Sequence, residues 1–339
     1  MDNHLLEIRN LSVEYRTEIA DVYAVNDITL TLEPGDALGL VGETGAGKTT
    51  TALSILRLLP NGVGHITGGD ILVEGESILK MPESKLEKIR GGTISMIFQD
   101  PMSALNPVLT VGKQIDEALE VHHPDWTKAQ RAARIDEMME LVGIPANRKV
   151  EYPHEFSGGM KQRIVIAIAL ACEPKLILAD EPTTALDVTI QAQMLGLIAD
   201  LQHRLGTAMI LITHDFGVVA QTCKRVAVMY GGEIVEYGTA EHIFIGKYLH
   251  PYTAGLFNAI PKLDSKSKRL ETIPGLMCDP TVKPSGCRFA ERCKYATDAC
   301  GEKQNYYEPE PGHLIKCLRY AGGAAESGTA GTETAGGAD

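Results

Sequence analysis

The glycine-rich stretch GETGAGKT, at residues 42–49, constrains the fold of this chain more than any other feature. It matches the P-loop pattern G-x-x-x-x-G-K-[ST], in which backbone amides and a helix N-terminus bind phosphate oxygens. The apolar segment DALGLV leads into it, and the amphipathic segment TTALSILRLL continues from it. A strand, a glycine-rich loop and a helix in this order are typical of a parallel α/β sheet. The sequence therefore predicts an α/β fold that binds a nucleotide.

The P-loop pattern assigns roles within this stretch. Lys48 is expected to reach the β- and γ-phosphates of the nucleotide, and Thr49 is expected to ligate Mg²⁺. The loop and the start of the helix would surround the phosphates, so the predicted ATP-binding residues here are Gly42, Glu43, Thr44, Gly45, Ala46, Gly47, Lys48, Thr49 and Thr50. An ordinary glycine-rich turn is the alternative, and the flanking strand and helix disfavour it.

A pair of carboxylates follows the apolar strand LILA. Asp180, at the end of a buried strand, can hold Mg²⁺ through water. Glu181 precedes Pro182, which disfavours helical geometry and leaves the glutamate placed to polarise an attacking water. On their own these residues could as well cap the next helix. Beside a P-loop, the catalytic interpretation is favoured.

The segment FSGGMKQR, at residues 156–163, predicts a second anion site. Ser157 can cap a helix, while Gly158 and Gly159 leave their amides open. Helix N-termini of this kind are common, so the segment alone does not indicate an anion site. Its position between the P-loop and Asp180 favours that interpretation.

Together these motifs resemble those of one family. GETGAGKTT, MIFQDP, FSGGMKQR, LILADEPTTALD and LITHD occur in the order found in the ATP-binding subunits of ABC transporters, and the resemblance covers about residues 5 to 250. GETGAGKTT is similar to their Walker A motif, FSGGMKQR to their signature, and LILADEPTTALD to their Walker B motif and D-loop. Phe156 and Met160 replace the commonest Leu and Gln of the signature, but the Ser-Gly-Gly core is intact.

The resemblance implies the fold class and the domain organisation. We expect an α/β fold, an ABC-type P-loop ATPase domain with an antiparallel β subdomain and a helical subdomain, plus a small cysteine-rich C-terminal extension. The ATPase domain is assigned to residues 1–257, with the helical subdomain at about 104–155. The extension is assigned to residues 258–320. Residues 321–339 lack large apolar side chains and predict a disordered tail.

The resemblance also implies a mechanism. Two such domains would face each other head to tail, with each ATP between the Walker A motif of one subunit and the signature of the other. Asp187 would lie in the D-loop. The residues that would act on the partner's nucleotide are Ser157, Gly158, Gly159 and Met160. The implied catalytic residues are Glu181, His214, Gln99 and Lys48, and those implied for Mg²⁺ are Thr49, Gln99 and Asp180.

One aromatic side chain is expected to stack on the adenine. Tyr15 ends the first predicted strand, at the place where this family stacks an aromatic on the base. Tyr23 is the competing candidate, and either residue could instead pack within the sheet. We favour Tyr15.

Cysteines crowd the end of the chain. The segment GCRFAERCKYATDAC and the preceding HPYT resemble the C-terminal extension of ATPase subunits of dipeptide and oligopeptide importers, some of which carry a [4Fe–4S] cluster. The matching residues are Cys287, Cys293, Cys300 and Cys317. Their spacing, C-x5-C-x6-C-x16-C, fits neither the short knuckles of zinc sites nor the ferredoxin run. We favour a cluster, with zinc or unliganded thiols as alternatives. Cys278 falls outside the pattern, and Cys172 and Cys223 are predicted to be core residues.

Composition narrows the function class. The net charge of -12 disfavours a nucleic-acid surface, which needs a basic footprint. The N-terminus shows no signal-peptide pattern, and the longest apolar run, residues 164–172, is shorter than the roughly 20 residues of a membrane span. We therefore expect a cytosolic chain.

The number of motifs disfavours two other classes of ABC ATPase. Translation ATPases usually carry two P-loops and two signatures, whereas this chain has one of each. Chromosome-type members separate their motifs with long coiled coils, and the sequence contains none. Exporter halves usually carry their own spans.

The expected function is therefore ATP hydrolysis that energises uptake of di- or oligopeptides through an ABC importer. Nickel, a sugar or glutathione are alternative solutes, and a non-transport ABC ATPase is the less favoured alternative. The implied partners are a second ABC ATPase subunit, either a paralogue or a second copy, and two membrane permease subunits, with an extracytoplasmic solute-binding protein acting indirectly. The expected location is the cytoplasmic side of the cell membrane, as a peripheral subunit.

Overall fold

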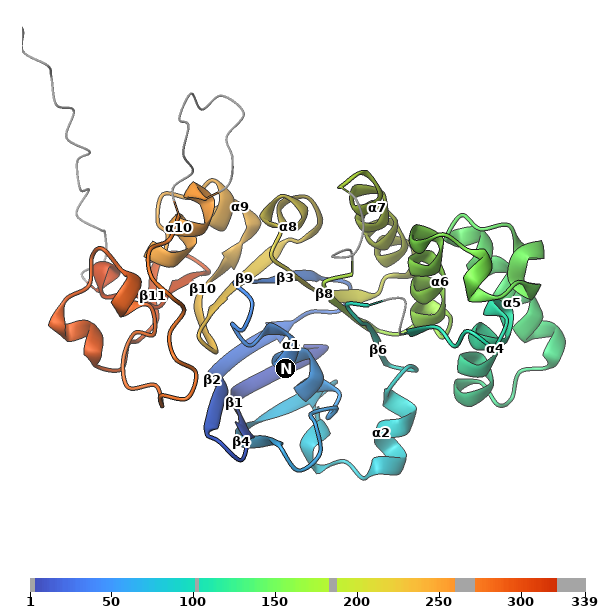
Figure 1. Cartoon of the computed structure of the whole chain (residues 1–339), viewed down its shortest axis with the longest axis horizontal. Helices are drawn as coiled ribbons and strands as arrows, with labels where there is room; N and C mark the ends of the chain where they lie inside the picture. The colour runs from blue at the N-terminus through green and yellow to red at the C-terminus, as the bar shows by residue number, and fades with distance from the viewer. Residues whose placement is uncertain (1–3, 101–103, 183–187, 260–271, 322–339) are drawn as a thin grey trace, which may run out of the picture.

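The computed structural model describes residues 4–100, 104–182, 188–259 and 272–321. Its strands form two sheets, with strand orders β2-β1-β4-β5 and β11-β12-β10-β9-β3-β8-β7-β6. Helices α4 and α5 lie at one end of the molecule, and α10 and β11 lie at the other (Figure 1). Within the described residues, no helix is both long enough and apolar enough to cross a bilayer.

The smaller sheet is antiparallel and contains the first predicted strand, which Tyr15 was expected to end. Its members are β1 (Leu6–Arg16), β2 (Asp21–Leu32), β4 (Gly64–Val73) and β5 (Glu76–Ser77). Strand β1 pairs with both β2 and β4, placing Leu6 opposite Leu32 on one side and Val73 on the other. Alternate β1 residues are buried because one face of this sheet packs on the core.

The larger sheet has a parallel centre and an antiparallel side. The parallel strands are β3 (Ala37–Val41), β6 (Ile94–Ile97), β7 (Leu176–Asp180), β8 (Ala208–Thr213) and β9 (Arg225–Tyr230). The antiparallel strands are β10 (Glu233–Thr239), β11 (Tyr307–Glu310) and β12 (His313–Ile315). Strands β3, β7 and β8 are buried throughout, because both faces of a parallel sheet are covered. Strands β9 and β10 pair antiparallel as a hairpin.

Strand β3 divides the hydrophobic core into two clusters. Leu38 and Leu40 face the cluster shared with the antiparallel sheet and α1, whereas Ala37 and Val41 face the cluster on the opposite side. This alternation follows from the two-residue period of a strand. The P-loop at the end of β3 is thereby held by packing on both faces.

Helices cover the large sheet and form the segment expected to be the helical subdomain. The α-helices are α1 (Lys48–Ile55), α2 (Glu83–Ile89), α4 (Val111–His122), α5 (Lys128–Leu141), α6 (Gly158–Leu170), α7 (Val188–Leu205), α8 (Phe216–Thr222), α9 (Ala240–Phe244) and α10 (Pro251–Asn258). The 3-10 helices are η1 (Ile78–Lys80), η2 (Ala146–Val150), η3 (Pro153–Glu155), η4 (Ala290–Arg292), η5 (Asp298–Gly301) and η6 (Leu318–Tyr320).

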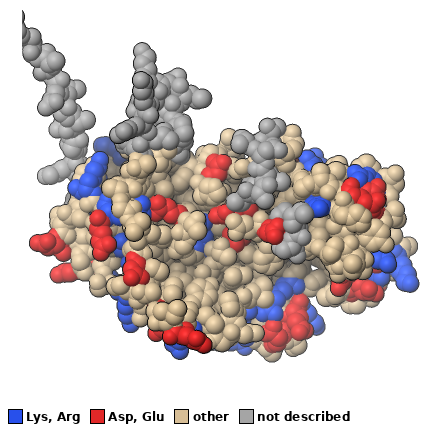
Figure 2. Space-filling view, in the orientation of Figure 1, with Lys and Arg blue, Asp and Glu red and all other residues tan. Residues whose placement is uncertain are grey.

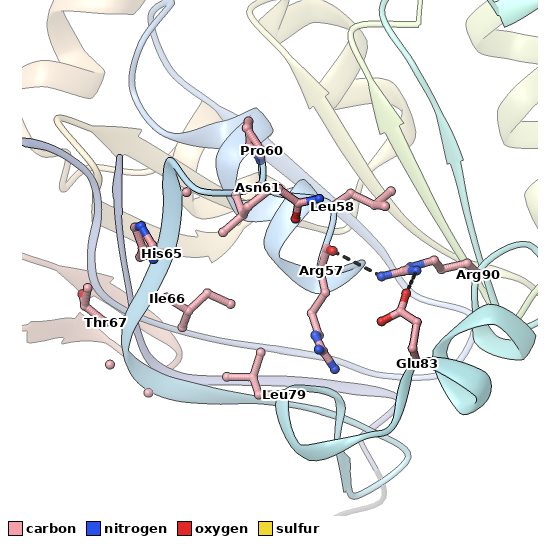
Figure 3. A pocket seen from close by; sticks show the side chains of 14 residues that line it. Arg57, Leu58, Pro60, Asn61, His65, Ile66, Thr67, Leu79, Glu83 and Arg90 are labelled. Carbon is pink, nitrogen blue, oxygen red and sulfur yellow. Dashed lines mark hydrogen bonds and ion pairs between the residues drawn. The ribbon is translucent and has the colours of Figure 1, made fainter. Parts of the chain in front are cut away.

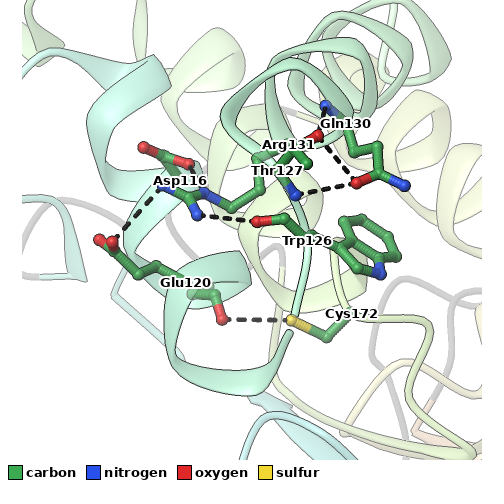
Figure 4. A network of polar contacts seen from close by, with 8 residues as sticks. Asp116, Glu120, Trp126, Thr127, Gln130, Arg131 and Cys172 are labelled. Carbon is green, nitrogen blue, oxygen red and sulfur yellow. Dashed lines mark hydrogen bonds and ion pairs between the residues drawn. The ribbon is translucent and has the colours of Figure 1, made fainter. Parts of the chain in front are cut away.

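Polar contacts join α4 to α5 in the segment expected to be the helical subdomain (Figure 4). Thr127 caps α5, and its side chain and that of Gln130 form a reciprocal capping box. The Arg131 guanidinium, which is 9% exposed, lies 2.6 Å from the Asp116 carboxylate of α4. The same side chain donates to the Trp126 carbonyl at 3.4 Å. These bonds satisfy a nearly buried charge between two helices.

The C-terminal residues 272–321 pack against the ATPase strands. Strand β12 pairs antiparallel with β10, with Glu236 opposite Ile315 and Tyr237 opposite Leu314. The Glu236 carboxylate and the His313 ring, both 0% exposed, lie 2.8 Å apart. The boundary predicted at residue 257 stays a prediction. The predicted tail, apart from Ala321, lies outside the described residues.

Candidate functional site

The P-loop connects β3 to α1 through backbone that requires glycine. Gly47 caps α1 with φ 102°, in the left-handed region. A Cβ at Gly47 would lie 2.4 Å from the Ala24 carbonyl oxygen, and one at Gly42 would lie 2.2 Å from the Met229 carbonyl oxygen. Both glycines are therefore fixed by close approach of neighbouring strands as well as by their own dihedral angles.

Lys48 is held inside this loop. Its ammonium donates to the carbonyl of Gly42 at 2.7 Å and to that of Glu43 at 3.0 Å. Burial lowers the pKa of Lys48, and the charges of Glu181 and Asp180 oppose that shift. The buried ammonium bonds two loop carbonyls and is stabilised by the charges of nearby carboxylates, and its positive charge suits an anionic ligand.

Thr49 and Asp180 meet at the end of the parallel strands. The Thr49 hydroxyl donates to Asp180 Oδ1 at 3.2 Å. Asp180 is 4% exposed. Burial raises its pKa, and the bond from Thr49 opposes this shift. A hydroxyl beside a buried carboxylate is the oxygen pair expected to hold Mg²⁺ in a P-loop site.

Glu181 lies next to this pair and joins two other predicted residues. Its φ is 43°, an uncommon value for a residue with a side chain, and its N–H donates to the Ile212 carbonyl at 2.9 Å. Gln99 Nε2 donates to Glu181 Oε2 at 3.2 Å. His214 Nδ1 lies 3.5 Å from Glu181 Oε1. The structure thus brings Gln99, Glu181 and His214 together at the carboxyl ends of β6, β7 and β8, where strained backbone is often functional.

The predicted signature segment begins α6. Ser157 caps the helix by accepting a bond from the Met160 N–H at 3.4 Å. Ser157 and Gly158 are exposed, and outside the chain neighbours and the backbone of α6 no atom lies within 4 Å of a Cβ built on Gly158. Further along α6, Gln162 Nε2 donates to the Pro182 carbonyl at 2.7 Å. The signature helix is therefore bonded to the residue that follows Glu181, while its N-terminus stays open.

The two tyrosines differ in their surroundings. The Tyr15 hydroxyl lies 3.1 Å from the Thr50 hydroxyl, on the helix that follows the P-loop. The Tyr23 backbone N–H donates to the Pro280 carbonyl at 2.8 Å. Tyr15 therefore adjoins the predicted phosphate site. Its role at the base stays a prediction. Asp187 lies outside the described residues.

A wide cavity in the described part of the chain lies away from these residues. It has a volume of about 1060 Å³ and lies between β4, α2 and the end of α1 (Figure 3). Arg90 crosses one side, where it bonds the Arg57 carbonyl at 3.2 Å and pairs with Glu83. None of the predicted site residues lines this cavity. It is an open groove of the antiparallel sheet rather than the phosphate site.

The four matched cysteines line a common cavity. Cys287, Cys293, Cys300 and Cys317 border a space of about 270 Å³, together with Phe289, His250 and Arg319. Burial raises the pKa of Cys287 to about 11 and also raises the pKa of Cys293 and of Cys317. Across the described residues, however, no group of three or more Cys, His, Asp or Glu side chains is arranged to hold a metal ion.

The remaining cysteines are placed differently. Cys172 and Cys223 are buried, which confirms the prediction that they are core residues. Burial raises their pKa to about 11 and about 12. Cys278 is half-buried, and its N–H donates to the Tyr230 hydroxyl at 3.2 Å.

Sequence reasoning missed two residues near the P-loop. The Tyr252 hydroxyl accepts a bond from the Glu43 N–H at 2.9 Å. Arg292 forms an ion pair with the Glu43 carboxylate at 2.7 Å. Tyr252 belongs to the HPYT segment, which drew attention only as a resemblance. No local pattern marks Arg292.

Comparison with known proteins places these features in context. A family profile described as "ABC transporter" matches residues 25–184, and one described as "Oligopeptide/dipeptide transporter, C-terminal region" matches residues 235–300. The chain is 47% identical over 319 residues to a probable peptide ABC transporter ATP-binding protein of Sinorhizobium fredii, covering 93% of this chain and 95% of that protein. It is 46% identical to the oligopeptide transport ATP-binding protein OppD of Salmonella typhimurium, covering 94% of each.

A solved structure shares the fold. It is the dimeric structure of an ATP-binding cassette in a post-hydrolysis state, bound to ADP and Pi. The TM-score is 0.62 at 26% identity, covering 69% of this chain and 98% of that one. The sheets, helices and P-loop described above therefore form an ATP-binding cassette fold.

Proposed function

This chain belongs to the ATP-binding subunits of the oligopeptide and dipeptide ABC transporters, and we propose that it hydrolyses ATP to energise peptide uptake. The observation that carries the proposal is the meeting of Gln99, Glu181 and His214 beside the Thr49–Asp180 pair. The peptide substrate is supported by relatives that match along nearly their whole length and carry peptide-transport names.

Each residue of the site has a role that its surroundings support. Lys48, whose ammonium is held by two loop carbonyls, would bind the β- and γ-phosphates. Glu181 would accept a proton from the water that attacks the γ-phosphorus, while the bond to the β–γ bridging oxygen breaks. His214 and Gln99 would orient Glu181 and contact the γ-phosphate. Thr49, Asp180 and Gln99 would hold Mg²⁺, which neutralises phosphate charge when bound.

Dimerisation would complete the site. Ser157, Gly158, Gly159 and Met160 lie at the N-terminus of α6, where the positive end of the helix dipole favours an anion. We propose that they contact the nucleotide of a partner ATPase, either a paralogue or a second copy. The dimeric, nucleotide-bound relative supports this arrangement. Asp187 would serve in the D-loop of the same interface.

The wider assembly is proposed from the same family. Two membrane permease subunits would dock on the helical subdomain of α4 and α5, and an extracytoplasmic solute-binding protein would deliver the peptide. The chain would then be peripheral, on the cytoplasmic side of the membrane. Basic and acidic side chains are interspersed over the face seen in Figure 2, which supports a protein partner rather than nucleic acid.

We propose that the thiol cavity holds a [4Fe–4S] cluster, whose binding would require the four cysteines to leave the arrangement described above, in which the described side chains form no metal site. Support comes from the single cavity shared by Cys287, Cys293, Cys300 and Cys317, and from Lys316 and Arg319 at its border, whose charges suit an anionic group. Anaerobic purification should yield about four irons and four sulfides per chain. Cys300→Ser should lose them, and the control Cys278→Ser should keep them. Stoichiometric zinc, or no metal, would contradict the proposed cluster but would leave the proposed ATPase function unaffected.

Hydrolysis is tested by removing the general base. Glu181→Gln should lower the rate of ATP hydrolysis by about 10²- to 10⁴-fold, because the attacking water loses its proton acceptor. Binding of a fluorescent ATP analogue should persist. The control Glu241→Gln alters an exposed carboxylate and should hydrolyse ATP at the wild-type rate. Cells that carry Glu181→Gln as their sole copy should fail to take up a radiolabelled dipeptide. Wild-type hydrolysis by Glu181→Gln would contradict the proposed mechanism.

A further inference from the structure

Arg292 reaches from the cysteine-rich extension to the P-loop. Its Nη1 lies 2.7 Å from Glu43 Oε2, and its Nη2 lies 3.2 Å from Glu43 Oε1. The pair is therefore bidentate, the geometry in which arginine binds a carboxylate most firmly. Glu43 is the second residue of GETGAGKT, and Arg292 directly precedes Cys293 of the thiol cavity. Two consecutive residues of the extension thus contact the P-loop and line the thiol cavity.

The guanidinium is fixed on its other sides. The Arg292 side chain is 7% exposed. Its Nε donates to the Pro274 carbonyl at 3.0 Å, and its Nη1 also approaches the Tyr230 hydroxyl at 3.4 Å. The charge lies 5.7 Å from the Tyr230 ring centre and 5.9 Å from that of Phe289. Such a side chain has little freedom to follow Glu43 if the loop moves, so the loop is held in place by the extension.

Glu43 is held through its backbone as well. Its N–H donates to the hydroxyl of Tyr252, which is 0% exposed, at 2.9 Å. Its carbonyl accepts a bond from the Lys48 ammonium at 3.0 Å. The carboxylate, amide and carbonyl of a single residue therefore join the C-terminal part of the chain to the lysine of the phosphate site.

We propose that Arg292 is a positioning residue for the nucleotide site, which acts through Glu43 to hold the P-loop and Lys48 ready for ATP. This inference rests on the proposed ATPase function. It assigns the extension a part in nucleotide binding, in addition to any group held by its thiols.

A second ion pair offers a matched control. Lys303 of the extension lies 3.1 Å from Asp27 of β2, with side chains 77% and 44% exposed. Like the Arg292–Glu43 pair, it joins the extension to the ATPase domain, but neither of its residues belongs to the P-loop. Ion pairs that are exposed on both sides contribute little to stability. In the Arg292–Glu43 pair, by contrast, the arginine side chain is only 7% exposed, so removing Glu43 leaves a buried charge without its partner.

The experiment is a double-mutant cycle on the full chain. Arg292→Met keeps the apolar stem, Glu43→Gln keeps the shape of the loop residue, and the double variant removes both charges. Either single change should raise KM for MgATP, and the dissociation constant of a fluorescent ATP analogue, by about 2- to 30-fold. The kcat of Arg292→Met at saturating ATP should stay within about twofold, since Arg292 does not touch the reacting atoms. The double variant should resemble the single ones, because the pair acts as a unit. Lys303→Met should match the wild type.

The results of this cycle distinguish a positioning role of Arg292 from a purely structural one. A purely structural role would lower the amount of active protein, so kcat would fall while KM stayed unchanged. Unchanged KM and unchanged affinity in Glu43→Gln would overturn the inference, even if Arg292→Met failed to fold. Additive effects in the double variant would also overturn it. Absence of hydrolysis by the wild type would instead contradict the proposed function.

Discussion

Gly47 shows how one residue can be fixed by both conformation and space. Its φ of 102° disfavours a side chain, and a Cβ there would lie 2.4 Å from the Ala24 carbonyl oxygen. Gly47→Ala should therefore lower the free energy of unfolding by about 2–5 kcal/mol, from strain plus overpacking. Urea denaturation measures this loss.

Gly62 provides the control for that prediction. Its φ is 76°, but no atom lies within 4 Å of a Cβ built on it. Gly62→Ala should cost only about 1–2 kcal/mol, the conformational part. Equal losses at the two positions would show that the contact with Ala24 contributes nothing.

At the residue scale, sequence motifs predict the positions of site residues that belong to one short segment. The places of Lys48, Thr49 and Asp180 followed from the P-loop pattern and from a carboxylate after a buried strand. The Glu43–Arg292 pair could not be predicted, because its partners are 249 residues apart and an isolated arginine carries no pattern. Long-range side-chain pairs depend on the finished fold.

At the scale of elements, the N-caps of α4 and α5 make a useful contrast. Thr127 accepts the Gln130 N–H in a capping box, whereas Thr110 makes no such side-chain bond at the start of α4. Thr127→Ala should lower the free energy of unfolding by about 1 kcal/mol. Thr110→Ala should change it by clearly less. Urea denaturation of both variants is the measurement, and equal effects would contradict the capping argument.

Local patterns also predicted the strand that leads into the P-loop and the helix that follows it. Strand β12 escaped prediction, because three residues give no periodicity to read. Its place is set by pairing with β10 and by the buried Glu236–His313 contact, both of which join distant parts of the chain.

At the scale of the whole molecule, His250 links stability to pH. It is 1% exposed, and its Nδ1 accepts the Tyr252 N–H at 3.1 Å. Burial, aided by the nearby charge of Lys316, lowers the pKa of His250 to about 3. Its backbone N–H donates to the Glu236 carboxylate at 2.8 Å. The folded protein therefore keeps this ring neutral, while the unfolded chain protonates it below about pH 6.5.

The sign of the pH effect follows from proton uptake. Between about pH 6.5 and pH 3 the unfolded chain binds one more proton at this site, so stability is fully present above pH 6.5 and falls as the pH falls. The contribution is about 1.4 kcal/mol per pH unit. His250→Asn keeps a capping side chain without the titration, and should reduce the loss measured by urea denaturation between pH 7 and pH 5. His203→Asn, at an exposed histidine, should leave that loss unchanged. A slope unaltered by His250→Asn would contradict the assignment.

The pairing of β10 with β12 bears on how the protein avoids aggregating with its own copies. Without residues 307–315, β10 would present a row of unpaired backbone groups, an open template for a strand from another chain. The extension covers that template and leaves β11 outermost instead. Strand β11 contains Pro309, which has no N–H to donate, between Glu308 and Glu310, whose like charges repel a second copy. Residues 307–315 thus shield the β10 edge of the ATPase sheet from pairing with another chain.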